Sequence, residues 1–218
     1  MTLRSLSAMP ASAPPRKRRK EARPGELTAA ALELFVEKGY AATRLEDIAA
    51  RAGVSKGTLY LYFEGKDALF KAVIQEGLVP ALAELEGLVA GHRGSSSDLL
   101  RRLIENWWAM VGETPYSGIP KLMIAEARNF PEVAQFYYEN VVLRGRRLFA
   151  AVLERGMACG EFRRLDIPAC IDVVIAPMLM LVIWRHSLAH CRLASQEPRA
   201  YLDVHLELLR GGLLAPAL

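Results

Sequence analysis

Residues 43–63, TRLEDIAARAGVSKGTLYLYF, constrain the fold more than any other part of the chain. Two short helical patterns are separated by Gly53, a residue that can adopt the positive φ of a tight turn. Ile48, Leu59 and Phe63 are the apolar positions that would hold the two helices together. The pattern predicts a helix-turn-helix whose second helix presents a polar face, and such a face fits a DNA major groove about 12 Å wide.

The flanking residues predict where the helices of this domain begin and end. A helix is expected to begin near Glu26 and to end at Gly39, a C′ residue in the left-handed conformation. Thr43 to Glu46 matches a capping box and predicts a second helix over residues 43–52. Ser55 is expected to cap a short third helix. The exposed face of this third helix would consist of Ser55, Lys56, Gly57, Thr58, Tyr60 and Tyr62.

The remaining residues predict further helices and no strand. Helical periodicity covers residues 66–89, 98–113, 119–130, 131–158, 166–191 and 198–209, with Pro80 and Pro177 as expected kinks and a Gly/Ser-rich linker over 91–97. We therefore expect an all-α fold with an N-terminal three-helix helix-turn-helix domain (25–72). A disordered basic arm (1–24) would precede it, and a C-terminal helical bundle for ligand binding and dimerisation (73–218) would follow.

The positive charge lies in the first third of the chain. Residues 1–66 have a net formal charge of +5, whereas residues 67–218 have −1. This asymmetry is typical of a nucleic-acid-binding module joined to a neutral domain. Our hypothesis for Arg16–Lys20 is that this run follows the DNA backbone or enters the minor groove. The alternative is a basic tail without a partner.

The segment LEDIAARAGVSKGTLYLYFEGKDALFKAVI, with ELTAAALELFVEKGYAAT before it, resembles the DNA-binding domain of the TetR family. The resemblance covers roughly residues 24–75, and beyond them only the helical plan and the length match. It implies a repressor that binds a palindromic double-stranded DNA operator as a homodimer. A small-molecule effector would shift the protein to a conformation with wrongly spaced recognition helices, and the helix over 66–89 would link the two sites.

The resemblance also implies individual contacts with DNA. Thr43 and Arg44 would contact phosphates through backbone N–H and side chain, and Lys66 would clamp a phosphate. Base edges would be read by Lys56 and Thr58, with Gly57 allowing a close approach of the backbone, while Tyr60 and Tyr62 would touch phosphate, a thymine methyl or the groove edge. Alternatively, Lys56 is only a solvated charge, and Tyr60 or Tyr62 packs on the fourth helix. Glu64 departs from the usual pattern and puts any backbone contact there in doubt.

The C-terminal region has enough apolar surface for two tasks. Dimerisation is expected through the last two long helices, where Ile171, Val174, Met178, Leu181 and Val182 are too apolar to face water. An effector pocket needs aromatic and flexible side chains, and the candidates are Trp107, Trp108, Met110, Met123, Phe136, Tyr137, Met180 and Trp184. Each could instead be an ordinary core residue. Glu126 and Arg128 could orient a polar ligand or be surface charges.

Other classes of protein are disfavoured by the sequence. Three cysteines suit a reducing compartment, and the N-terminus lacks a signal-peptide pattern, so a bacterial cytoplasmic protein is expected. The apolar run over 173–184 is shorter than the ~20 residues of a membrane span, so no membrane partner is expected. His186, His190 and Cys191 lack a further ligand, so no metal is expected. No cofactor or enzyme motif is evident, and an architectural DNA binder would not need the large C-terminal domain.

Overall fold

The computed structural model describes residues 16–188, 191 and 197–215. They form ten α-helices, two π-helical turns and one 3-10 turn. Apart from one isolated bridge between Phe162 and Leu214, the described residues form no β-structure. The expected all-α fold is therefore confirmed.

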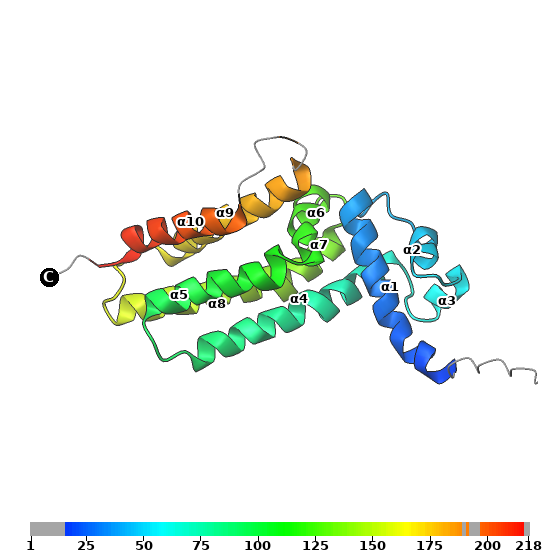
Figure 1. Ribbon diagram of the computed structural model, residues 1–218, viewed down its shortest axis with the longest axis horizontal. Helices are drawn as coiled ribbons and strands as arrows, with labels where there is room; N and C mark the ends of the chain where they lie inside the picture. Colours follow the sequence, from blue (N-terminus) through cyan, green and yellow to red (C-terminus); the bar gives the residue numbers. More distant parts are fainter. Residues whose placement is uncertain (1–15, 189–190, 192–196, 216–218) are drawn as a thin grey trace, which may run out of the picture.

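A small three-helix domain occupies one end of the molecule (Figure 1). It consists of α1 (Arg16–Lys38), α2 (Leu45–Arg51) and α3 (Lys56–Tyr60). The first turns of α4 (Lys66–Gly91) complete its core, which includes fully buried Phe35, Ile48, Leu59 and Phe70. The rest of α4 continues into the body of the protein, so one continuous helix spans the predicted boundary at residue 72.

The first helix is longer than predicted. It begins at Arg16 rather than near Glu26, so residues 16–24 of the predicted disordered arm are helical. Arg, Lys, Glu and Ala dominate this stretch and have high helix propensity, and the helix continues through Pro24. Residues 1–15 of the predicted arm lie outside the described residues.

Two glycines form the turns that the sequence predicts. Gly39 has φ +85° after the end of α1, and its N–H donates to the Phe35 carbonyl at 3.0 Å. Gly53 has φ +65° in the turn between α2 and α3. These values lie in the left-handed region that side chains with a Cβ rarely adopt. Both turn predictions are confirmed.

One of the two predicted helix caps is wrong. Ser55 caps α3 as expected, because its hydroxyl accepts from the Thr58 N–H at 3.1 Å. The capping box at Thr43 does not form, since α2 begins one residue later with Arg44 at its N-cap. The buried Thr43 hydroxyl instead donates to the carbonyls of Leu34 (3.1 Å) and Gly39 (2.6 Å) at the end of α1.

The body is a helical bundle built on α4. It contains α5 (Ser96–Trp107), α6 (Gly118–Glu126), α7 (Pro131–Tyr137), α8 (Leu143–Ala158), α9 (Ile167–Ser187) and α10 (Pro198–Leu213). The long helices α4, α5 and α8 pack together, and α9 and α10 lie on one side of them (Figure 1). Two π-helical turns, η1 (Trp108–Gly112) and η3 (Tyr138–Val142), extend α5 and join α7 to α8.

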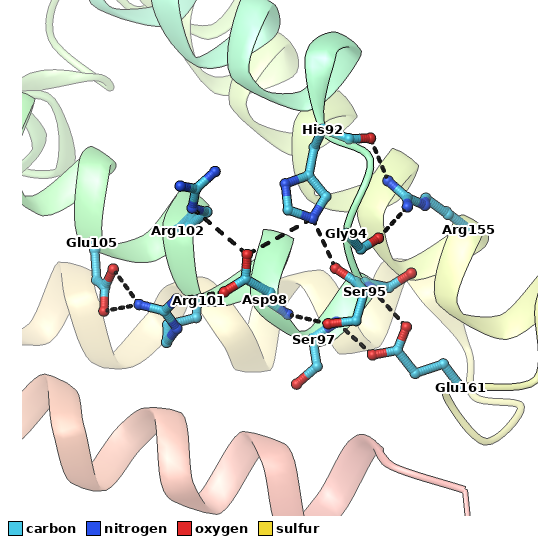
Figure 2. Close-up of polar contacts among 11 residues, drawn as sticks. His92, Gly94, Ser95, Ser97, Asp98, Arg101, Arg102, Glu105, Arg155 and Glu161 are labelled. Carbon is cyan, nitrogen blue, oxygen red and sulfur yellow. Dashed lines mark hydrogen bonds and ion pairs between the residues drawn. The ribbon is translucent and has the colours of Figure 1, made fainter.

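The predicted linker over 91–97 is shorter in the structure: residues 92–95 form a loop between α4 and α5, Gly91 ends α4, and residues 96–97 begin α5 (Figure 2). The Glu161 carboxylate accepts from the N–H groups of Ser96 (2.6 Å) and Ser97 (2.8 Å) at the start of α5. Arg155 on α8 donates to the His92 carbonyl at 3.1 Å. The loop between α4 and α5 is thereby joined to the end of α8 and the residues that follow it, and this end of the bundle is fixed.

Two glycines permit close packing, one between α4 and the turn before α6, and the other between the bundle and α1 of the three-helix domain. A Cβ at Gly77 of α4 would lie 1.9 Å from the Tyr116 ring, and a Cβ at Gly118 of α6 would lie 2.4 Å from Val36 of α1. Because real Cβ contacts are never this close, both glycines permit an approach that no other residue allows. A hydrogen bond of 2.5 Å from Thr28 to Glu76 adds a polar contact between α1 and α4.

Candidate functional site

The exposed face of α3 is the candidate surface for binding DNA. Ser55, Lys56, Gly57 and Tyr60 are exposed, and Tyr60 is 48% accessible and is not among the side chains packed against the core of this domain. A Cβ at Gly57 would meet only Ser55 Oγ, at 3.8 Å, so the space above this residue is open. Thr58 is half-buried, with its hydroxyl 2.8 Å from the Ser55 hydroxyl.

Lys56 is already engaged within this surface. Its ammonium bonds to the Glu46 carboxylate of α2 and lies 5.8 Å from the centre of the Tyr60 ring. This hydrogen bond raises the pKa of Lys56 and lowers that of Glu46. Both side chains are about half exposed (52% and 54%), so water screens the ion pair strongly. A phosphate of a nucleic acid can therefore replace the Glu46 carboxylate as the partner of the Lys56 ammonium.

The residues after α3 divide between surface and core. Tyr62 is half-buried against the core of the three-helix domain. Leu61 is 81% exposed, the largest accessible fraction among the exposed large apolar side chains of the described residues. Leu61 is not among the predicted DNA contacts, although its i+4 spacing from Gly57 places it on the same helical face. An exposed leucine here can offer apolar contact to a thymine methyl.

Lys66, the predicted phosphate clamp, bonds within the protein in this structure. Its ammonium donates to the carbonyls of Tyr40 (2.8 Å), Ala41 (3.3 Å) and Thr43 (3.3 Å) in the loop between α1 and α2. Burial lowers the pKa of Lys66. An ammonium group has three donors, and all three are used inside the protein. The Thr43 hydroxyl is likewise committed to carbonyls, whereas Arg44 is exposed.

The α1–α2 loop also contacts the bundle through the α6–α7 corner. The Glu126 carboxylate accepts from the Ala41 N–H at 3.3 Å. The Phe130 ring packs edge-on against Tyr40 with centroids 4.6 Å apart, and the Lys66 ammonium lies 5.7 Å from the centre of the same ring. Glu126 was a candidate for orienting a ligand, but its carboxylate faces this loop. Arg128, the other such candidate, is exposed.

The bundle contains a cavity of about 800 Å³ that is partly open to solvent and lies within the size range of small-molecule sites. Its walls come from α4, the end of α5 with η1, α6, α7 with η3, α8 and α9, and are mostly apolar. The lining includes Leu78, Ala81, Leu82, Leu85, Trp107, Val111, Pro120, Met123, Ile124, Ala127, Pro131, Ala134, Gln135, Tyr137, Tyr138, Val141, Val142, Gly145, Arg146, Phe149, Asp172, Ile175, Ala176, Met178 and Leu179. Both π-helical turns contribute, and such turns frequently occur at functional sites.

Three of the eight predicted pocket residues line this cavity: Trp107, Met123 and Tyr137. The other five lie elsewhere. Trp108 is buried in the bundle core, Met110 and Phe136 pack against the cores, Met180 is 42% exposed, and Trp184 lines a separate groove between α9 and α10. The sequence identified the composition of the wall but not which side of each helix faces the cavity.

Polar groups in the cavity wall are few. Arg146 of α8 bonds to the Asp172 carboxylate of α9, and it also donates to the Pro168 carbonyl at 3.5 Å. Within the described part of the chain, the Tyr137 hydroxyl has no hydrogen-bond partner. Burial raises the pKa of Tyr137, so this group stays a neutral hydroxyl.

The outer face of α9 and α10 is unusually apolar. Val173 (65%) and Met180 of α9, with Val204 and Leu208 (71%) of α10, are exposed. The 21-residue helix α9 is long and apolar enough to cross a membrane by length and composition, and only 28% of its most apolar window is buried. The predicted face residues Ile171, Val174, Met178, Leu181 and Val182 are instead buried within the bundle. The apolar surface that remains exposed is therefore the one formed by Val173, Met180, Val204 and Leu208, on the side of the helices that faces away from the bundle.

The described residues contain no group of three His, Cys, Asp or Glu side chains that could hold a metal ion. His186 bonds to the Ser117 hydroxyl at 2.8 Å and belongs to the contact between α9 and the start of α6. His190, the second imidazole of the weighed metal site, lies outside the described residues.

Comparison with known proteins identifies the family. Residues 27–73 match the family model described as bacterial regulatory proteins, tetR family, and residues 92–194 match that of a tetracyclin repressor-like C-terminal domain. The transcriptional regulator YfiR of Bacillus subtilis is 30% identical over 67% of this chain and 71% of its own length. The transcriptional repressor KstR2 of Rhodococcus jostii is 28% identical over 66% of this chain and 70% of its own.

A regulator from Saccharomonospora viridis, solved in complex with choline, has a similar fold. Its TM-score is 0.75 at 19% identity, over 90% of this chain and 99% of that one. The family models lie on the same two parts of the chain that the structure divides into the three-helix domain and the bundle. The chain thus belongs to the TetR family of DNA-binding transcriptional regulators.

Proposed function

We propose that this regulator is a repressor that leaves a palindromic operator when a small apolar or amphipathic effector enters the bundle cavity. Residues 25–72 would bind DNA, and residues 73–218 would bind the effector and dimerise. Repression follows the family resemblance and the name of the relative KstR2. The cytoplasm is the compartment where such an operator would be met.

The observation that carries this proposal is the double role of the α6–α7 corner. Met123, Ala127 and Pro131 line the cavity, while Glu126 and Phe130 between them hold the α1–α2 loop. That loop precedes α2 and α3 directly. A ligand that pushes the cavity wall outward would thus move the support of the recognition helix. Helix α4 provides a second connection, because its middle lines the cavity and Lys66 at its start holds the same loop.

DNA contacts are proposed for the exposed groups of the α2–α3 surface. Lys56 and Tyr60 would reach base edges or phosphates, Arg44 a phosphate, and Gly57 would let the backbone approach. Thr58, Tyr62 and the backbone N–H groups of Thr43 and Lys66 remain candidates for closer contacts. Leu61 joins this set because of its exposure.

The decisive experiment measures fluorescence anisotropy of the upstream intergenic DNA with full-length protein. Wild type is expected to bind in a salt-sensitive manner, and the double variant Lys56→Ala/Tyr60→Ala should lose at least about 30-fold in affinity, since each contact contributes about 1–3 kcal/mol. Arg164→Ala is the matched control because it removes one exposed positive charge in the α8–α9 connection. An equal loss in the control, or full affinity in the double variant, would refute the assignment.

The homodimer is proposed to form through the outer faces of α9 and α10. Val173, Met180, Val204 and Leu208 would be buried against the same residues of a second copy, which gives the two recognition helices a fixed spacing. Leu208→Glu should produce a monomer in sedimentation velocity. A dimer that persists in this variant, while Ile124→Glu abolishes it, would place the interface elsewhere; Ile124 is also exposed and apolar, but on α6.

A further inference from the structure

The cavity is elongated along one helical stripe. Pro131, Gln135, Tyr138, Val142, Gly145 and Phe149 follow each other at three- or four-residue spacing along α7, η3 and α8, and all line the cavity. From Pro131 to Phe149 a helix rises about 27 Å. A wall of this length suits a chain-shaped ligand better than a compact one.

The two charged residues of the lining, Arg146 and Asp172, lie at one end of this stripe. Ser117 and Lys121, at the start of α6, contact His186 near the end of α9, whereas Asp172 lies fourteen residues earlier on α9. That separation corresponds to about 21 Å along the helix. The α6 end of the cavity has Pro120, Met123 and Ala127 in its wall, and the opposite end has the Arg146–Asp172 pair.

The two members of the ion pair differ in exposure. The Asp172 side chain is 64% accessible, whereas the Arg146 side chain is 31% accessible and is also held by the Pro168 carbonyl. A ligand carboxylate can therefore replace Asp172 at the guanidinium while Asp172 turns into water at little cost. A ligand cation would have to displace Arg146, which has less access to water and an additional bond to break.

We propose that the effector is a single-chain amphiphile with an anionic head, which places its carboxylate at Arg146 and its chain along the stripe toward α6. This inference rests on the proposed effector role of the cavity. The chain would reach Met123 and Ala127 beside Glu126, so occupancy would act on the corner that holds the α1–α2 loop. The free Tyr137 hydroxyl offers a further hydrogen bond along the path.

The test uses full-length, delipidated protein and three probes with the same chain: laurate, dodecanol and dodecyltrimethylammonium, each below its micelle-forming concentration. Binding is measured by titration calorimetry, with adamantanecarboxylate as a compact anion. Laurate is expected to bind most tightly. Arg146→Gln should weaken laurate binding about 10- to 100-fold, because a hydrogen bond to a charged group is lost, and should leave dodecanol binding unchanged. Arg147→Gln, an exposed neighbour that does not line the cavity, is the matched control.

Asp172→Asn removes the competing carboxylate and should tighten laurate binding. The head-group assignment is overturned if dodecyltrimethylammonium binds best and loses affinity in this variant, or if Arg146→Gln binds laurate like wild type. The chain shape is overturned if adamantanecarboxylate binds as tightly as laurate. Absence of binding by all four probes overturns the proposal as a whole.

DNA binding is measured on the same samples without any probe. If wild type binds the operator but none of the probes, the inferred effector class is wrong and the DNA-binding function stands. If it binds laurate but no DNA, the regulator proposal fails independently. The two failures are thus distinguishable.

Discussion

The DNA-binding surface and the cavity are built in different ways. The surface comes from residues 44–61, which are nearly contiguous, and its shape depends on local features such as the Ser55 cap and the Gly53 turn. The cavity needs walls from six regions spread over residues 78–179. In the surface, polar side chains point outward with little support, whereas in the cavity apolar side chains are fixed by packing on their other sides.

Within the surface, the side chains proposed to bind DNA differ from those that stabilise the fold. Lys56 and Arg44 are exposed, so replacing either side chain leaves no buried polar group without a hydrogen-bond partner. Thr43 and Lys66, close by in sequence, donate to buried or half-buried carbonyls. The proposed recognition surface is thus supported from behind by side chains whose polar groups bond within the protein.

The largest expected effect tests this separation at two adjacent residues. Thr43→Val keeps the shape but removes both hydrogen bonds from a side chain that is 2% exposed. It should lower the free energy of unfolding by about 2 kcal/mol, the cost of leaving buried acceptors unpaired. Arg44→Ala should leave stability unchanged and weaken operator binding about tenfold. Urea denaturation measures the free energy of unfolding, and fluorescence anisotropy measures operator affinity. If Arg44→Ala destabilised the fold while Thr43→Val weakened only operator binding, the proposed separation of roles would be wrong.

A second, smaller effect concerns pH, because all histidines of the chain lie outside the three-helix domain. Burial lowers the pKa of His205, which bonds to the Val174 carbonyl at 2.9 Å, and burial with nearby Arg185 and Lys121 lowers that of His186. In the unfolded chain these two imidazoles are protonated as the pH falls through their ordinary pKa of 6.5. In the folded bundle they remain neutral to a lower pH. Stability is therefore full above pH 6.5 and falls as the pH drops below it.

Thermal unfolding at a series of pH values checks this. The decrease in Tm below pH 6.5 should be reduced in His205→Gln, which keeps a donor for Val174. A profile identical to that of wild type would show that His205 is not responsible.

Gly57→Ala should change stability and DNA binding in opposite directions. The space above Gly57 is open, so alanine should stabilise α3 by about 0.5 kcal/mol through its higher helix propensity. The added methyl group would stand between the helix and the groove and should weaken operator binding. Gly87→Ala, at an exposed and equally open position of α4, is the control that should stabilise without altering affinity. Equal affinities in both variants would mean that the backbone at Gly57 stays away from DNA.

The smallest expected effect on stability distinguishes cavity from core. Ala134→Phe projects into the cavity and should change the free energy of unfolding by no more than about 0.5 kcal/mol, whereas overpacking a filled core costs about 1–3 kcal/mol. Ala49→Phe, at a site that is 2% exposed, provides the comparison. Laurate binding should disappear in Ala134→Phe with operator binding retained. A strong destabilisation would instead indicate that this region is packed.

The sequence predicted the local features well because each depends on few neighbours. Gly39, Gly53 and Ser55 determine turns and a cap through their own backbone or side chain. The capping box at Thr43 failed because a hydroxyl there can equally reach back to carbonyls of α1, and only the packing of α1 on α2 decides which bond forms. The bonds of the Lys66 ammonium to the α1–α2 loop were not predicted for the same reason, since its acceptors lie 23 or more residues away.

The cavity could be predicted only by composition. Trp107 and Trp108 are adjacent, yet one lines the cavity and the other is buried in the core, because neighbouring residues of a helix face different directions. Arg146 and Asp172 meet across two helices and leave no signal in either segment alone. Which faces enclose empty space depends on the relative placement of all walls, and no single pattern encodes it.

The close approach at Gly77 has a consequence for how such a chain can evolve. The tip of the Tyr116 ring occupies the place that a side chain at position 77 would need. Position 77 therefore cannot gain a side chain by itself: a chain that acquires alanine at 77 must also move the ring at 116 or replace it with a smaller group. Among relatives that share this contact between α4 and η2 (Pro115–Ser117), a tyrosine at 116 should be accompanied by glycine at 77, whereas glycine at 77 can remain after the tyrosine is lost.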